Sequence, residues 1–134
     1  MKKFAVVSLF LFIALGLFFL KENFNLKSKG EAKKADVVLT WDYNPKSIDL
    51  KTPVNFTFTL KDKEGKNIEN AKIDIEATMN HGGMIPIFTE AIYLKDAIYS
   101  TRFKLTMLGE WIIFLTITLP DGSVASKEVV LQTN

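Results

Sequence analysis

The chain of 134 residues contains no cysteine and a single histidine. Without thiols it forms no disulfide and no thiolate metal site, and a domain of this length can fold without disulfides on either side of a membrane. The sequence also has no glycine-rich phosphate loop after a strand and no recognisable Ser, His and Asp arrangement. These absences argue against nucleotide-dependent and hydrolytic enzymes, and we expect no enzymatic activity.

A marked excess of charge is absent as well. The 17 basic and 15 acidic residues give a formal net charge of +2, and Lys2 and Lys3 account for the whole difference. A nucleic-acid binder needs a basic patch or stripe. Basic residues cluster only between Lys27 and Lys34, where contact with lipid headgroups or solvent is the better explanation. We therefore expect no nucleic-acid partner.

The longest uncharged run covers residues 4–20, between Lys3 and Lys21. As a helix rising about 1.5 Å per residue it would span roughly 25 Å, slightly less than a hydrocarbon core of ~30 Å. A signal peptide has the same basic start but ends at a small-residue cleavage site, whereas this run ends Leu17-Phe18-Phe19-Leu20. The sequence favours an uncleaved single-pass membrane anchor in residues 1–20, and a cleaved signal peptide with a secreted product is the alternative.

The basic residues that lead this run, Lys2 and Lys3, favour a cytoplasmic N-terminus, although further lysines follow the run closely. Because the leading residues usually dominate, we expect the rest of the chain to face the periplasm or the cell exterior. Residues 21–35 are rich in lysine and show no sustained periodicity, so they are predicted to form a flexible tether.

From residue 36 onward the pattern predicts β-structure. Val54, Phe56, Phe58 and Leu60 alternate with polar residues, which is typical of a half-buried strand. Similar alternation predicts strands over residues 71–79, 97–107 and 111–119, a last strand follows at residues 124–132, and weaker strands are predicted over residues 37–43 and 85–94. Seven short strands separated by turns favour an all-β, immunoglobulin-like antiparallel β-sandwich of two sheets in residues 36–134. The Cys…Trp…Cys hallmark of antibody domains is missing, so the likeness concerns architecture only.

The domain does contain a small group of soft metal donors. Apart from Met1, the methionines are Met79, Met84 and Met107, and two of them flank His81 in the segment MNHGGM. Thioether and imidazole donors without thiols favour Cu(I) over zinc, magnesium or calcium. Residues i and i+2 of a strand project to one face, and the two glycines permit a reversal that returns Met84 to the same place. We therefore predict a copper site formed by Met79, His81, Met84 and Met107.

Each of these residues also has an ordinary structural explanation. Met79 and Met107 continue inward-facing apolar series, and methionine commonly fills gaps in a core. His81 can equally be an exposed loop residue with no partner. The segment Met107-Leu108-Gly109-Glu110 is predicted to form a hairpin turn, after which Trp111 enters the core.

The order of these motifs resembles that of the YtkA-like domain family, relatives of the FixH and CcoH proteins. The resemblance covers about residues 36–132, and its most specific element is the Met…Gly…Trp series. Ala97-Ile98 replaces the glycine that usually precedes the tyrosine of this family. The matching residues are Gly65-Lys66-Asn67-Ile68 with Ala71-Lys72-Ile73, the MNHGGM segment, and Tyr99 through Met107, Gly109 and Trp111. The resemblance implies an extracytoplasmic accessory protein, with links in several relatives to copper handling and terminal oxidase assembly.

Two functions of different classes follow as hypotheses. The first is a membrane-anchored accessory protein that binds Cu(I) at the rim of the sandwich and passes it to a client cuproprotein or oxidase subunit. The second is a metal-free interaction or assembly module at the membrane surface. It is suggested by Ile112 and Phe114, which form an apolar outer patch unless Ile92 and Leu94 of another strand cover them.

Overall fold

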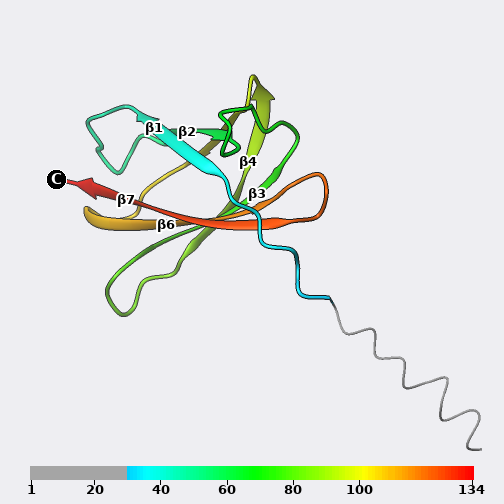
Figure 1. The fold of residues 1–134 in the computed structure, drawn as a ribbon. Coiled ribbons are helices and arrows are strands. Elements are labelled where there is room, and N and C mark those ends of the chain that lie inside the picture. The colour runs from blue at the N-terminus through cyan, green and yellow to red at the C-terminus, as the bar shows by residue number, and fades with distance from the viewer. Residues whose placement is uncertain (1–29) are drawn as a thin grey trace, which may run out of the picture. The chain divides into compact units, whose positions relative to one another are not determined.

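The computed structural model describes residues 30–134. The predicted anchor, residues 1–20, and residues 21–29 of the predicted tether lie outside the described residues. Within residues 30–134, no helix is long and apolar enough to cross a membrane. Figure 1 shows the seven strands of the described part: β1 (Val38–Asn44), β2 (Val54–Lys61), β3 (Lys72–Met79), β4 (Ile87–Lys95), β5 (Ile98–Phe103), β6 (Gly109–Thr118) and β7 (Val124–Thr133).

All strand pairs are antiparallel, and they form one sheet in the order β1-β2-β5-β4-β3-β6-β7. β4 joins the two halves, because residues 87–91 pair with β3 whereas residues 92–95 pair with β5. The predicted all-β class and the seven strands are confirmed. The prediction of two separate sheets is corrected: β4 belongs to both layers, so the sandwich is a single sheet folded over on itself.

The two edges of this sheet approach each other where the chain enters the domain. Lys34 pairs in parallel with Val124, the first residue of β7. The amide of Ala35 donates to the Val124 carbonyl at 2.8 Å, and the Val124 amide donates to the Lys33 carbonyl at 2.9 Å. Residues 33–35, the end of the predicted tether, are therefore hydrogen-bonded to the domain, and the sheet is nearly closed.

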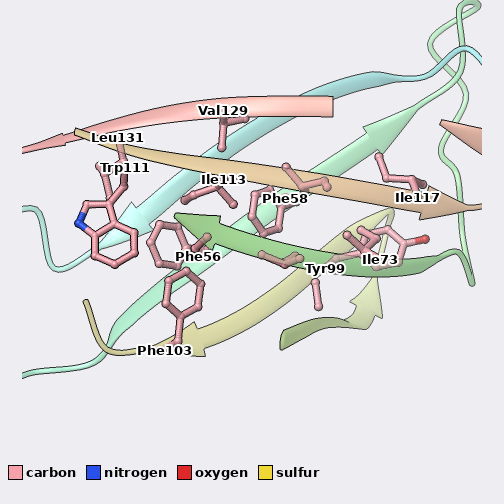
Figure 2. Packing of buried hydrophobic residues seen from close by; sticks show 14 of the residues in the cluster. Phe56, Phe58, Ile73, Tyr99, Phe103, Trp111, Ile113, Ile117, Val129 and Leu131 are labelled. Atoms are coloured by element: carbon pink, nitrogen blue, oxygen red, sulfur yellow. The ribbon is translucent and has the colours of Figure 1, made fainter. Parts of the chain in front are cut away.

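The hydrophobic core lies between the two layers. Alternation along each strand sends every second side chain inward, and the inward parities predicted for residues 54–60, 71–79 and 111–117 are confirmed by their burial. Figure 2 shows aromatic side chains of β2 and β5 meeting aliphatic and aromatic side chains of β6 and β7. The largest fully buried side chains include Trp111, Tyr99, Phe56, Phe58 and Ile113.

Tyr99 is the buried residue with the most specific polar contacts. Its hydroxyl donates to the Ile68 carbonyl at 2.9 Å and accepts from the Ala71 amide at 3.0 Å. Burial raises the pKa of Tyr99 above its ordinary value, so the hydroxyl keeps the proton that it donates. This side chain on β5 therefore holds the connection that leads from β2 into β3.

We expect Tyr99→Phe to lower the free energy of unfolding by about 1–3 kcal/mol, because it leaves the Ile68 carbonyl and the Ala71 amide without their partner. Urea unfolding followed by circular dichroism measures the change. Tyr43→Phe is the matched control, since no hydrogen bond of the Tyr43 hydroxyl occurs among residues 30–134. Equal effects of the two substitutions would contradict a structural role for the Tyr99 hydroxyl.

Candidate functional site

The predicted metal donors lie at the end of the folded sheet where β3 and β5 finish and β4 and β6 begin. The segments 79–86 and 104–111 meet at this end, and we call them the rim. They meet because β3 pairs along its whole length with residues 111–118 of β6, with Met79 opposite Trp111 in the last pair.

Met79 is the last residue of β3 and is only 7% exposed. Its predicted inward orientation is confirmed. The methyl carbon of Met79 lies 2.8 Å from the position that a Cβ atom would take at Gly109. Gly109 also has a φ of +131°, which L side chains rarely adopt. The methionine side chain therefore packs over Gly109, where an added β-carbon would displace the end of that side chain and the backbone conformation favours glycine.

Trp111 anchors the other side of the rim. Its indole is fully buried, as predicted, and its Nε1–H donates to the carbonyl of Met107 at 2.9 Å. This bond satisfies the only polar atom of a buried tryptophan side chain. The same bond holds the backbone of Met107 close to the strand pair that Trp111 forms with Met79.

Two predictions for the segment 104–108 are wrong. Met107 does not continue the inward series, because β5 ends at Phe103, Leu105 is the last buried member and Met107 is 43% exposed. The hairpin turn predicted for residues 107–110 is also absent, since β6 already begins at Gly109. β5 pairs with β2 and β4, whereas β6 pairs with β3 and β7, so residues 104–108 cross from one layer to the other.

His81 and Met84 lie in the loop between β3 and β4. His81 is exposed, and its Nδ1 lies 3.3 Å from the carbonyl oxygen of Gly82. When Nδ1 carries the proton and donates to this carbonyl, the lone pair of Nε2 is free to bind a metal. The predicted reversal is present at Gly83, whose φ is +85°. Met84 is half-buried and packs against the hydrophobic core.

The rim therefore brings one buried, one half-buried and one exposed thioether to the same end of the sheet as the exposed imidazole. Among the described residues, no group of three or more His, Asp or Glu side chains is placed to hold a metal ion. The methionine-containing set is the candidate site that the sequence predicts, and thioether and imidazole donors suit a soft ion.

A second feature lies on the outer face of β3, β4 and β6. Phe88 is 72% exposed and Phe114 is 39% exposed. The alternative in which Ile92 and Leu94 cover the apolar patch is wrong, because both are themselves exposed on the part of β4 that pairs with β5. Phe88 was not among the residues predicted for this patch, although it has the same parity as Ile92 and Leu94 and therefore lies on the same face of the strand.

Comparison with known proteins identifies the family. The model of the family described as YtkA-like matches residues 26–116, which include all four candidate donors as well as Gly109 and Trp111. The chain belongs to the YtkA-like family. The predicted resemblance is confirmed, and the matched part of this YtkA-like chain ends within β6, before β7.

No curated protein matches the chain. Among solved structures, a hypothetical protein from Pyrococcus horikoshii is similar with 14% identity and a TM-score of 0.48, covering 75% of this chain and 96% of that one. A superoxide reductase (neelaredoxin) from Ignicoccus hospitalis has 8% identity and a TM-score of 0.48, covering 82% of this chain and 87% of that one.

The contact between Met79 and Gly109 predicts an energetic coupling at the rim of the YtkA-like domain. Gly109→Ala should lower the free energy of unfolding by about 1–3 kcal/mol, because the new methyl group overlaps the methionine side chain and the backbone is strained. Chemical denaturation of Gly109→Ala, Met79→Ala and the double variant measures the coupling. Strict additivity of the two substitutions would show that the close approach does not matter.

Proposed function

We propose that this YtkA-like protein binds Cu(I) at the rim and delivers it, as cargo, to a cuproprotein or oxidase subunit. Met79, His81 and Met84 are the principal ligands in this proposal, and Met107 is the fourth. The observation that carries the proposal is the collection of all soft donors of residues 30–134 at one end of the sheet. The copper handling implied by the resemblance to YtkA-like relatives agrees with it.

The chemistry of the donors favours a monovalent soft ion. Zinc sites are commonly built from thiolates, several imidazoles or carboxylates, and the rim offers a single imidazole and no thiolate. Thioethers select Cu(I), which accepts few ligands and needs no negative charge from them.

The placement of the donors suits exchange of the ion. Met79 is fixed by the core and by its contact with Gly109, whereas His81 stands in solvent on a loop that contains two glycines. A site with one anchored ligand and others on a loop can hand over its ion by successive replacement of ligands. A carrier needs this property, and a buried structural site lacks it.

The proposed location is the outer surface of the cell membrane, with residues 1–20 as the anchor. This part of the proposal rests on the basic residues Lys2 and Lys3 before the apolar run. Proximity to a membrane would keep a copper carrier close to a membrane-bound oxidase.

A second candidate function, a metal-free docking module, is favoured by the exposed side chains of Phe88 and Phe114. Aromatic residues are depleted from free surfaces and enriched at the centre of interfaces. Docking and copper binding use opposite faces of β3, so the two functions are compatible.

Purified in detergent, the full chain should bind one Cu(I) and compete for it with a coloured Cu(I) chelator. His81→Ala and Met84→Leu should each weaken binding at least about tenfold, since loss of an outer-shell partner alone costs ~10–100-fold in metal affinity. Affinity should also fall in acid, because a protonated imidazole cannot bind copper. If wild type and His81→Ala lose copper to the chelator equally, the copper proposal fails and the docking module takes its place.

Two further variants separate ligation from folding in this titration. Met79→Leu keeps most of the buried volume and removes the sulfur, so it should weaken copper binding while costing less than about 1.5 kcal/mol of stability. Ile85→Ala changes a loop residue that is 86% exposed and offers no donor, so its affinity should equal that of wild type.

The proposed orientation predicts that an alkaline phosphatase fused to Asn134 is active, because this enzyme folds only outside the cytoplasm. A fluorescent protein that matures only in the cytoplasm should be dark at the same position. An inactive phosphatase fusion together with a fluorescent fusion at Asn134 would reverse the orientation. The double variant Lys2→Glu/Lys3→Glu should reduce phosphatase activity if these two residues set the topology.

A further inference from the structure

The outer face of β3, β4 and β6 carries an arrangement that neither the family nor the copper proposal explains. Glu76 on β3 lies directly opposite Phe88 on β4 and directly opposite Phe114 on β6. The three side chains therefore form one row across three strands, with the carboxylate between the two aromatic rings. A shallow groove runs between the rings, and Glu76, Asp74 and Thr116 contribute to its lining.

The dimensions of this row suit a flat cationic group. Neighbouring strands are about 4.8 Å apart, so the Cβ atoms of Phe88 and Phe114 are separated by roughly 10 Å. Two rings at this spacing can each lie against one side of a planar guanidinium group, which stacks on aromatic faces. Glu76 at the centre supplies the opposite charge and accepts hydrogen bonds.

The neighbouring row of this face already contains a cation that is paired with carboxylates. Lys72 Nζ lies 2.9 Å from Asp74 Oδ1 and 3.5 Å from Glu90 Oε1, so both of these carboxylates already have a partner. No such partner of Glu76 occurs among residues 30–134. Glu76 is half-buried, and a half-buried carboxylate gains more from an added cation than a fully exposed one does.

The residues around this row add further apolar area and negative charge to the face. Ile112 and Val130 are opposite each other in the adjacent row, and Val130 is 49% exposed. Glu128 lies opposite Phe114 on its other side. The face thus combines apolar contact area with negative charge, and a complementary surface must present a basic side chain surrounded by apolar ones.

We propose that Phe88, Glu76 and Phe114 form a receptor for an arginine side chain of a protein partner, which docks on the outer face of β3, β4 and β6. The assignment rests on the docking role proposed above and is independent of copper. The arginine would insert between the two rings and pair with Glu76, and the apolar neighbours of the arginine would cover Ile112 and Val130.

The test compares two probes on the full chain in detergent: acetyl-Ala-Arg-Ala-amide and the same peptide with citrulline, which has the shape of arginine without its charge. Affinities follow from the amide shifts of Glu76 and Phe114 in ¹H–¹⁵N correlation spectra. We expect the arginine peptide to bind about five- to thirtyfold more tightly than the citrulline peptide, as expected for a cation–π contact with an ion pair. Equal affinities in wild type would overturn the proposal.

Three variants locate the site. Glu76→Gln should abolish the preference for arginine, and Phe114→Leu should reduce it. The matched control Glu64→Gln removes the same charge from the turn after β2 and should leave the preference unchanged. A preference that survives Glu76→Gln would overturn the proposal, as would a preference lost equally in Glu64→Gln.

Two measurements separate this proposal from the docking role on which it rests. Sedimentation equilibrium without peptide reports self-association. If the wild type forms a dimer that Phe114→Asp dissociates, and the peptides show no preference for arginine, the face would be assigned to a second copy of the chain. A photo-crosslinking residue at Val130 in cells reports docking itself. Adducts of equal yield in wild type and Glu76→Gln would preserve the docking role and overturn the arginine receptor.

Discussion

The burial of Trp111 is the constraint on which the rim depends. A fully buried indole must give its N–H an acceptor, and the carbonyl of Met107 provides it at 2.9 Å. That bond fixes the end of the crossing segment, so that β6 starts at Gly109 with a φ that suits glycine. The space above Gly109 is then filled by Met79, the residue that pairs with Trp111. Core packing and the position of the candidate sulfur ligand are thus consequences of one buried side chain.

The alternation of apolar and polar residues along the strands was sufficient to predict which side chains lie in the hydrophobic core. It predicted Phe56, Phe58 and Ile113 in the core because a strand with one buried face must alternate. It failed at Met107, where the apolar alternation continues past the end of β5 at Phe103. Alternation predicts a face only while the chain remains a strand, and the crossing between layers is decided by pairings distant in the sequence.

The same limit explains why the outer face could be predicted only in part. Phe114 is visible in the sequence as an apolar residue of outward parity. Its relation to Phe88 and Glu76 is not visible, because it depends on β3 lying between β4 and β6. The change of partner along β4 is equally non-local. This strand pairs with β3 up to residue 91 and with β5 from residue 92. The local sequence pattern defines which side chains lie on each face of a strand. The order of the strands in the sheet defines which side chains of different strands are neighbours.

The two proposed sites share β3 but lie on its opposite faces. Met79 points inward at the end of the strand, and Glu76, three residues earlier, points outward. A partner held on the outer face would therefore leave the core around Trp111 in place, because Met79 and Trp111 are buried on the other face of the sheet. Such a partner could take copper from the exposed imidazole first and from the buried Met79 last. The order of ligand exchange in the proposed transfer would then follow burial, since His81 is exposed to solvent whereas Met79 is held in the core.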